Sequence, residues 1–268
     1  MPPQKIAISN LAFVQSSIVS VANILAENEI RYLEIAPTLV WTEPQDTDLN
    51  TRLEFKAQIT DYGLTVIALQ SLFFNKPELK FFLSSEGDRA CLNHLMKQVD
   101  LCSDLGGHLI SFGSPHTRKR NDLSLAEAMN RLSPVMIELA NYALNKNVTI
   151  CFEPVPRRFN CDFINTSAEC AKLVSMVDHP NFRMLLDTGA LLSNDENHQH
   201  VISNNIKQIA HVHLNDPDLF PPSKHFVEHF DFAQSLVAHD YDGYMTLEFT
   251  QFYKSLAEDI GFALDCYR

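Results

Sequence analysis

Residues 147–156 read NVTICFEPVP, a short apolar run that ends in Glu153 and a loop with two prolines. The apolar side chains of Val148, Ile150 and Phe152 alternate along this run, and polar residues precede it. Because the run is short, β-branched and sharply bounded, it predicts a buried parallel strand rather than a helix. A glutamate at the end of such a strand is costly to bury without a partner. Glu153 therefore needs a partner from elsewhere in the chain.

The same pattern recurs three times downstream, each time with a metal-capable side chain near the end of a predicted strand. FRMLLDTG carries Asp187, IAHVHLND carries His213 and YMTLEFT carries Glu248. The successive gaps of 34, 26 and 35 residues each match about one strand–helix–strand repeat. In a barrel built from such repeats, functional side chains lie at the C-terminal ends of the strands, which is where these four fall.

Strands and helices alternate along the whole chain. Strands are predicted at 6–13, 32–37, 64–74, 108–115, 147–153, 184–189, 211–216 and 244–249. Helices are predicted at 16–29, 48–62, 86–105, 124–144, from about 165 onward, and at 195–207, 224–239 and 252–265. Pro134 is expected to kink or split the fourth helix. This order predicts an α/β fold, a single (β/α)8 TIM barrel over residues 1–268. An open doubly wound sheet is the alternative, although no GxGxxG follows the first strand.

The overall composition favours a globular protein, with 46% hydrophobic residues among 268. A formal net charge of −12 argues against a nucleic-acid partner, because phosphate contacts need a basic surface. The N-terminal MPPQKIAISNLAF has no long apolar segment, and no run of about 18 apolar residues occurs, so we expect no membrane partner and a cytoplasmic location. The six cysteines form no CxxC pair and are expected to be reduced core residues.

Two glutamates, one aspartate and one histidine form an oxygen-rich set that suits one divalent ion. We expect Mn²⁺, with Mg²⁺, Co²⁺ or Zn²⁺ as alternatives. Taken singly, a strand-end glutamate is usually a solvated loop residue and a strand histidine is usually a satisfied core group. Four such residues on consecutive strands favour the metal site instead. His211 lies two residues before His213 and shares its face of the strand, either as a supporting group or as core.

Seven motifs together resemble the xylose-isomerase-like TIM barrels, in particular a branch of sugar phosphate isomerases and epimerases. The family also includes ketose 3-epimerases, inosose and dehydroshikimate dehydratases and endonuclease IV-type nucleases. The motifs run nearly the whole length: SNLAF at 9–13, LEIAPTLVW at 33–41, FGSPHTR at 112–118, FEPVP at 152–156, LDTGA at 186–190, HVHLND at 211–216 and TLEF at 246–249.

This resemblance implies that Glu153, Asp187, His213 and Glu248 hold one divalent ion. It further implies that Glu153 and Glu248 are catalytic and flank the substrate. One would take the proton next to a carbonyl and the other would return it, through a metal-stabilised enediolate. The expected function is a metal-dependent isomerase or epimerase of a sugar or sugar-derived carbonyl compound, possibly phosphorylated or carboxylated.

Two departures from the ketose epimerases bear on the reaction. Those enzymes carry a histidine where this chain has Ala190, and a second glutamate where it has Asn160. Their absence argues against free-ketose 3-epimerase activity and motivates one of three alternatives to the isomerase or epimerase, the non-catalytic barrel. A metal-dependent dehydratase would use the same enediolate to expel a hydroxyl group. A non-catalytic barrel would bind a sugar without turnover. A nuclease would need several further histidines on other strands.

Residues of the predicted barrel mouth are candidates for binding a small sugar-like substrate. The two loops SPHTRKR and PVPRRFN gather cations, and their paired arginines could grip a phosphate or carboxylate or could pair with nearby acids. The predicted substrate-binding residues are His116, Arg118, Arg158, Trp41, Gln70 and His211. Glu34 could point into the mouth or could pair with a basic loop. Many such barrels dimerise, so a homodimer is a further expectation.

Overall fold

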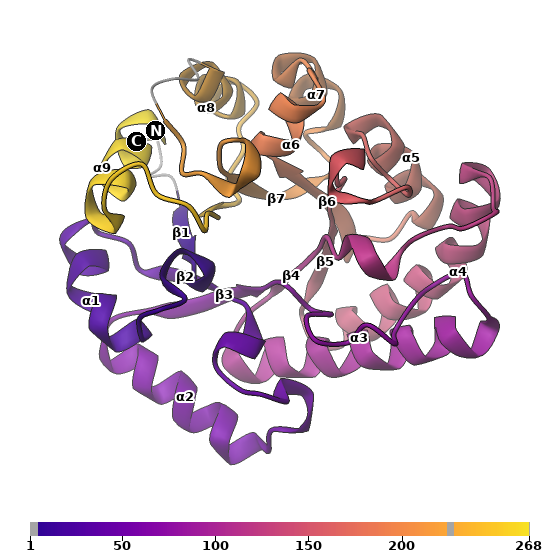
Figure 1. Cartoon of the computed structure of the whole chain (residues 1–268), viewed down its shortest axis with the longest axis horizontal. Helices are drawn as coiled ribbons and strands as arrows, with labels where there is room; N and C mark the ends of the chain where they lie inside the picture. The colour runs from indigo at the N-terminus through magenta and orange to yellow at the C-terminus, as the bar shows by residue number, and fades with distance from the viewer. Residues whose placement is uncertain (1–4, 224–227, 268) are drawn as a thin grey trace.

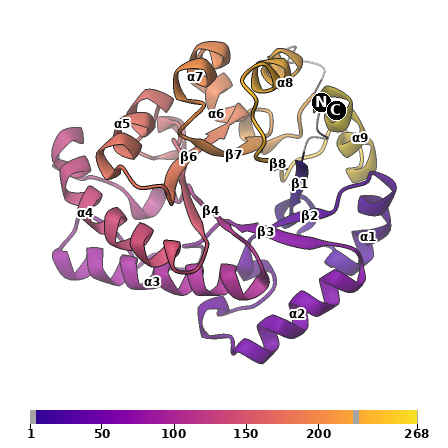
Figure 2. The ribbon, with the colours of Figure 1, turned by 180° about the vertical axis from the view of Figure 1, so that it is seen from behind.

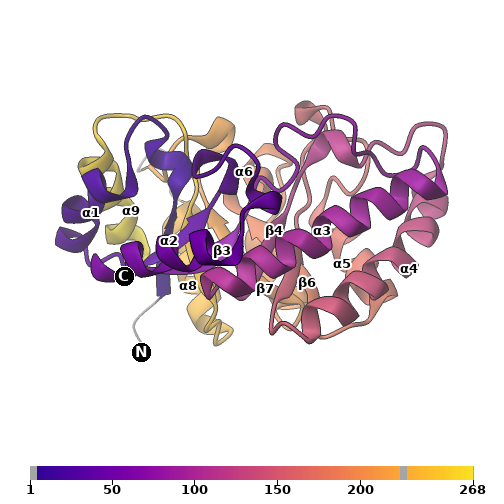
Figure 3. The same cartoon turned by 90° about the horizontal axis from the view of Figure 1, so that it is seen from below.

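The computed structural model describes residues 5–223 and 228–267, and in these ranges eight parallel strands close into a barrel in the order β1 to β8. The helices form an outer ring around the strands (Figures 1 and 2). Viewed from the side, α2 and α3 cross in front of the strands (Figure 3). The predicted (β/α)8 TIM barrel is therefore confirmed, and the open doubly wound sheet is wrong.

The elements have the following bounds. The strands are β1 Lys5–Ser9, β2 Tyr32–Ile35, β3 Thr65–Leu69, β4 Leu109–Phe112, β5 Thr149–Phe152, β6 Phe182–Asp187, β7 Ile209–Leu214 and β8 Tyr244–Leu247. The helices are α1 Ile18–Glu27, α2 Leu49–Asp61, α3 Ser85–Leu105, α4 Leu125–Leu144, α5 Ser167–Val177, α6 Thr188–Ser193, α7 His198–Asn205, α8 Glu228–Ala238 and α9 Leu256–Tyr267. Residues 224–227, where one helix was predicted to begin, lie outside the described ranges.

The predicted strands are too long at their C-terminal ends. The first was expected to reach residue 13 and the third residue 74, but β1 ends at Ser9 and β3 at Leu69. After β1 the chain turns into a short 3₁₀ helix, Asn10–Phe13, which the Ser9 hydroxyl caps by accepting from the Leu11 amide. Apolar residues continue past both strands because Phe13, Leu72 and Phe73 are buried in the main core, and this continuation made the strands appear longer.

Two further details of the helices differ from the prediction. The fourth helix, α4, is one continuous helix through Pro134, so the predicted split does not occur. A proline removes only one main-chain hydrogen bond, and burial of α4 against its neighbours outweighs that loss. Helix α6 was not predicted at all, because its six residues are too few for a periodic pattern.

Side chains alternate along each strand between the helices and the barrel axis. Those toward the helices are apolar, whereas those toward the axis change from apolar to polar along the strand. Ile110 and Phe112 of β4 belong to the main core between strands and helices, whereas Leu109 belongs to a smaller interior cluster. One step further along β4 the next interior position is Ser111, which is buried and polar. The interior therefore changes from apolar to polar toward the C-terminal ends of the strands, and this polar layer forms the site.

The cysteines and the helix lengths bear on two expectations from composition. The six cysteines are all free and buried, as predicted. Among the described residues, no helix combines the length and the apolar character needed to cross a bilayer.

Candidate metal centre

The four predicted ligands come together at the C-terminal ends of their strands. Glu153, Asp187, His213 and Glu248 each offer a ligand atom, and these atoms all lie within 4.8 Å of one another. Parallel pairing explains part of this convergence, because Asp187 of β6 pairs in register with His213 of β7. The Nδ1 atom of His213 lies 2.9 Å from Oε2 of Glu248, which follows β8.

Asp187 is fixed by the start of helix α6 and by Asn215. Its Oδ1 atom accepts a hydrogen bond from the Ala190 amide at 2.6 Å, which makes Asp187 the N-cap of that helix. Its Oδ2 atom accepts from Nδ2 of Asn215 at 2.7 Å. Thr188 and Gly189 in turn hold Asn215, through the Thr188 hydroxyl and the Gly189 amide. No sequence pattern indicated this supporting role of Asn215, although its partners Asp187, Thr188 and Gly189 all lie in the LDTGA motif.

His213 is oriented by Glu34, a buried carboxylate of β2. Nε2 of His213 lies 3.1 and 3.2 Å from the two Glu34 oxygens, and Nε2 of His211 lies 2.8 Å from Oε2. The Ser111 hydroxyl donates to Oε1 of Glu34 at 2.6 Å. Burial would raise the pKa of Glu34, but the charges of His213 and His211 lower that pKa well below its usual range. Glu34 is therefore ionised and can only accept, so the Nε2 atoms of both histidines donate to it.

This arrangement leaves Nδ1 as the atom that His213 presents to the four-residue group. A carboxylate that fixes the tautomer of a metal-binding histidine is a common supporting element of metal sites. Glu34, His211 and His213 themselves also lie within 4.8 Å of one another. Because both histidines hydrogen-bond to Glu34 and all three residues are buried, they support the main site. The structure thus makes His211 a supporting group, and it corrects the idea that Glu34 meets a basic loop or the mouth.

The electrostatics of the four-residue group favour a cation. Burial and then the charge of Glu248 raise the pKa of Glu153 to about 8, and the same two causes raise the pKa of Asp187 to about 6. Burial would lower the pKa of His213, but the carboxylates of Glu248 and Glu34 raise it well above its usual range. Burial and the neighbouring negative charge thus make Glu153 and Asp187 hold protons more readily than exposed carboxyl groups do. A set of hard oxygen atoms with one imidazole fits a divalent ion, which would supply positive charge there.

Glu153 owes its position to Gly113 and Arg118. A Cβ atom on Gly113 would lie 2.2 Å from Oε2 of Glu153, so only glycine leaves room for this carboxylate. Arg118 donates to the main-chain oxygen of Glu153 at 2.7 Å, and its guanidinium lies 4.7 Å from the Phe152 ring centre. Arg118 is fully buried. It therefore supports the end of β5, and the expectation that it grips a substrate anion is corrected.

The remaining predicted substrate-binding residues divide into those at the mouth and those away from it. Gln70 and His116 line one cavity of about 500 Å³ together with Glu153, His213 and Glu248. Arg158 lines an adjoining cavity of about 200 Å³ and pairs with Asp218 at 3.2 Å. Trp41 lines neither cavity and packs edge-on against Phe55 of α2.

The structure does not assemble the proposed fork of arginines. Arg118 is buried behind Glu153, whereas Arg158 lies at the mouth beside Asp218. Arg120, a third member of the basic loops, donates to the main-chain oxygen of Asp162. These three arginines are therefore used singly, two in loop structure and one in an exposed ion pair.

Gln70 connects the ligand Glu248 to the buried Glu34. In the amide orientation that satisfies both of its ends, its nitrogen donates to Glu248 at 3.0 Å and to Glu34 at 3.2 Å, while its oxygen accepts from the Ser9 hydroxyl at 2.6 Å. A glutamine at the end of an otherwise apolar strand was the only sequence signal for this role. Gln70 thus holds a candidate ligand as well as lining the cavity.

Comparisons with known proteins agree with this architecture. A family model described as a xylose isomerase-like TIM barrel matches residues 23–266. An inosose dehydratase of Bacillus thuringiensis is 24% identical over 220 residues, which cover 71% of this chain and 72% of that enzyme. An inosose dehydratase of Geobacillus thermodenitrificans is 35% identical over 75 residues, which cover 28% of this chain and 25% of that enzyme.

Solved structures with the same fold include an epimerase and a zinc-binding protein. The 3-keto-D-glucoside 4-epimerase of E. coli superposes with a TM-score of 0.78 at 20% identity, over 99% of both chains. The IolI protein with a bound zinc atom gives a TM-score of 0.75 at 16% identity, over 98% of this chain and 96% of that one. At these identities the likeness shows the shared fold alone.

Proposed function

The chain belongs to the xylose isomerase-like TIM-barrel family, and from this premise we propose that it is a divalent-metal-dependent isomerase or epimerase of a sugar-like carbonyl compound. One observation carries the proposal: Glu153 and Glu248 belong to the four-residue group and both line the same cavity. They follow β5 and β8, which are not neighbours in the barrel. A substrate between them meets carboxylates from two directions.

Glu153, Asp187, His213 and Glu248 would hold the ion, with Mn²⁺ as the first choice and Mg²⁺, Co²⁺ or Zn²⁺ as alternatives. When bound, a divalent ion supplies positive charge that polarises a carbonyl group and stabilises negative charge on its oxygen. The zinc atom of the IolI protein supports metal binding on this fold. The supporting residues Glu34 and Asn215 keep the histidine and the aspartate in place for this purpose.

The two glutamates carry the proton transfer. One carboxylate removes the proton from the carbon beside the carbonyl, and the other delivers a proton to the opposite face of that carbon or to its neighbour. Burial beside Glu248 gives Glu153 a pKa of about 8 before metal is bound, so its environment already favours holding a proton near neutral pH. Gln70, which donates to Glu248, orients the second carboxylate.

A sugar-like substrate is supported by the relatives, which include a 3-keto-D-glucoside 4-epimerase and inosose dehydratases. Free ketoses are disfavoured by Ala190 and Asn160. The Ala190 amide caps Asp187 and its side chain is a methyl group, and Asn160 is exposed at the end of a short 3₁₀ helix. Neither residue supplies the histidine or the glutamate of the ketose epimerases.

A dehydratase is the second candidate, because the curated relatives are inosose dehydratases. Removal of the same proton followed by loss of a hydroxyl group from the next carbon gives an unsaturated product. Proton NMR in D₂O separates the two reactions. Epimerisation replaces a carbon-bound hydrogen by deuterium without new alkene or deoxy signals, whereas dehydration creates them.

The proposal is tested first by metal content and then by exchange. Dialysed protein should contain about one Mn, Co, Mg or Zn per chain, and the double variant Asp187→Asn, His213→Ala should lose it. With metal, the protein should exchange hydrogen beside the carbonyl of one compound in a panel of free, phosphorylated and carboxylated keto sugars. Glu153→Gln and Glu248→Gln should each abolish exchange. Absence of metal in both the natural protein and the double variant, even after soaking in Mn²⁺, would refute the proposal. If the metal-loaded natural protein bound a sugar but neither it nor the glutamine variants turned it over, the chain would be a sugar-binding barrel.

A further inference from the structure

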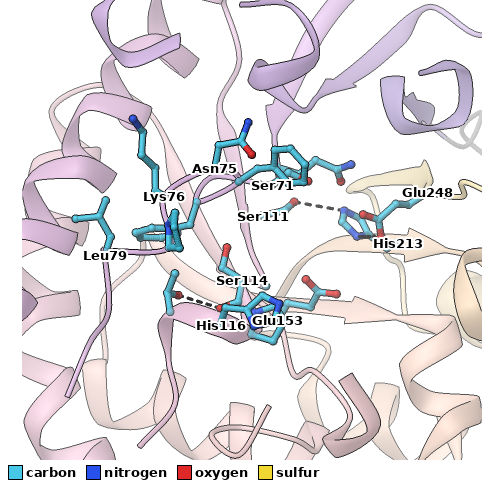
Figure 4. A pocket seen from close by; sticks show the side chains of 17 residues that line it. Ser71, Asn75, Lys76, Leu79, Ser111, Ser114, His116, Glu153, His213 and Glu248 are labelled. Atoms are coloured by element: carbon cyan, nitrogen blue, oxygen red, sulfur yellow. Dashed lines mark hydrogen bonds and ion pairs between the residues drawn. The ribbon is translucent and has the colours of Figure 1, made fainter. Parts of the chain in front are cut away.

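The candidate ligand Asp187 is set apart from the other three by the cavity that it faces. Glu153, His213 and Glu248 line the cavity of about 500 Å³ (Figure 4). Asp187 does not line that cavity and borders the cavity of about 200 Å³ instead. Its Oδ2 atom is fixed by Asn215, whose Nδ2 atom donates to it at 2.7 Å. Whatever holds Asn215 in place therefore also holds Asp187.

The peptide of Asn215 and Asp216 lies tightly against the start of helix α6. A Cβ atom on Gly189 would clash with Oδ1 of Asn215 and would lie 3.0 Å from the main-chain oxygen of Asp216. The Gly189 amide donates to Oδ1 of Asn215 at 2.9 Å, and the Ala190 amide that follows it donates to Asp187. Because a close-packed interior transmits small displacements, a shift of Asp216 must reach Asn215 and the first residues of α6.

Asp216 is held from its other side by a buried chain of polar groups. Its Oδ1 atom lies 2.6 Å from Nε2 of His229 on α8, and Nδ1 of His229 lies 2.5 Å from the hydroxyl of Tyr267 at the end of α9. All three residues are buried. Oδ2 of Asp216 accepts from the Tyr253 hydroxyl at 3.0 Å. Both carboxylate oxygens are thus engaged within the protein, so Asp216 supports the site and is not offered to a substrate.

The hydrogen bonds of this chain run in one direction. An ionised Asp216 can only accept, so Nε2 of His229 donates to it. In a neutral imidazole Nδ1 then accepts, and its donor is the Tyr267 hydroxyl. Burial raises the pKa of Tyr267 well above its usual range, which keeps that hydroxyl protonated. Loss of the hydroxyl would leave a buried nitrogen of His229 without a partner and loosen its hold on Asp216.

We propose that the Tyr267–His229–Asp216 chain is a positioning element of the metal centre, through which the last turn of α9 holds Asn215 and the ligand Asp187 in place. The inference rests on the proposed function for the metal, and it goes beyond that function by making two outer helices part of the site. The strands are complete at Leu247, twenty residues before Tyr267, so barrel closure does not itself require this contact. Helices α8 and α9 lie side by side (Figures 1 and 2), which allows His229 to join them.

The test removes one hydroxyl group at a time. Tyr267→Phe should raise the Kd for Mn²⁺ about fivefold to tenfold, at or below the lower end of the loss expected for groups that contact a ligand directly. Tyr241→Phe is the matched control, because its hydroxyl donates to the main-chain oxygen of Tyr244 at the start of β8, at 2.9 Å. Each variant loses one tyrosine hydrogen bond and a similar amount of stability. Calorimetric titration should show an unchanged Kd in Tyr241→Phe, and an unchanged Kd in Tyr267→Phe would refute the inference.

A double variant shows whether the effect passes through Asn215. Asn215→Ala should by itself weaken Mn²⁺ binding about 10–100-fold. If Tyr267 acts through Asn215, adding Tyr267→Phe to Asn215→Ala should change the Kd by less than about twofold. Independent losses in the double variant would refute the positioning role and leave Tyr267 as a structural residue only.

Amide hydrogen exchange of the metal-free protein decides the inference without any metal. The Gly189 and Ala190 amides donate to Asn215 and Asp187, so their exchange reports these two contacts directly. Both amides should exchange at least about tenfold faster in Tyr267→Phe than in Tyr241→Phe. Equal exchange in the two variants would refute the inference. If the natural protein bound no Mn²⁺, the proposed function would fail, whereas faster exchange in Tyr267→Phe would still establish that the chain positions Asp187.

Discussion

Replacement of Gly113 by alanine should remove metal binding while leaving the barrel folded. A Cβ atom at this position would lie 2.2 Å from Oε2 of Glu153, and ordinary contacts begin at 3.4 Å, so the carboxylate oxygen must move by about 1.2 Å. Metal–ligand distances tolerate only about 0.2 Å. We therefore expect the Kd for Mn²⁺ to rise at least 100-fold, which is about 2.8 kcal/mol.

The fold should tolerate this change, because the atom in contact is the end of a flexible side chain and Gly113 does not need a left-handed backbone. Calorimetric titration of the metal-free protein with Mn²⁺ measures Kd, and thermal unfolding with and without Mn²⁺ gives an independent reading of binding. Gly261→Ala is the matched control, since nothing lies within 4 Å of its Cβ position. It should bind Mn²⁺ normally and gain about 0.4–1 kcal/mol of stability.

A double variant shows whether the effect passes through the glutamate. If Gly113→Ala acts by displacing Glu153, then adding it to Glu153→Ala should change the Kd for Mn²⁺ by less than about twofold. An unchanged Kd in Gly113→Ala alone would refute the assignment of Glu153 as a ligand. Additive losses in the double variant would show that alanine at position 113 disturbs the site by another route.

Three further predictions follow from the surroundings of the ligands. The pKa values of Glu153 and Asp187, about 8 and about 6, lie above their ordinary values of 4.5 and 3.8, so the folded metal-free protein retains protons that the unfolded chain has lost. Raising the pH from about 5 to about 8 should therefore lower the Tm of the metal-free protein and increase the stabilisation by Mn²⁺. Scanning calorimetry would contradict this if the Tm of the metal-free protein rose with pH. Glu34→Gln should weaken Mn²⁺ binding about 10–100-fold, because a neutral amide no longer holds His213 in the tautomer that presents Nδ1. An unchanged Kd in titration would show that this tautomer does not depend on the charge of Glu34. Arg118→Met should lower the Tm by roughly 5–10 °C, or about 2–3 kcal/mol, whereas Arg158→Ala should change it by less than about 2 °C; equal effects would mean that burial of Arg118 is unimportant.

The convergence of the four candidate ligands could be predicted from sequence, because each lies at a recognisable position in a strand pattern. A β-rich run that ends in a carboxylate or carries a histidine is visible within ten residues, and parallel strands in a barrel bring such ends together. The order of Glu153, Asp187, His213 and Glu248 along the chain was therefore enough. The fold followed from the same repeats, and the errors were confined to strand ends, to α6 and to a proline that a packed helix tolerates.

The supporting residues could not be predicted in the same way, because their roles depend on contacts between distant segments. Glu34 meets His211 and His213 across 177 and 179 residues of sequence. The only sequence signal for the role of Glu34 was a single charged residue within an apolar strand. That signal is equally compatible with a partner in a loop. Arg118 sits in a basic loop whose local sequence indicates solvent, yet its side chain turns inward behind Glu153.

The two departures from the ketose epimerases leave the four-residue group intact. Ala190 contributes its main-chain amide to Asp187, and this contact would be the same with any side chain at that position. The four candidate ligands are therefore unaffected by Ala190, whereas the histidine side chain that would hydrogen-bond a substrate hydroxyl is absent. Arg158 and Asp218, which come from the loops after β5 and β7, line the cavity of about 200 Å³ together with Ala190. The four candidate ligands and these loop residues are separate, so a family fold can keep the first set while the second set changes. Under the proposed function, substrate specificity should therefore be sought in the loops after β3, β5 and β7, and not in the candidate ligands themselves.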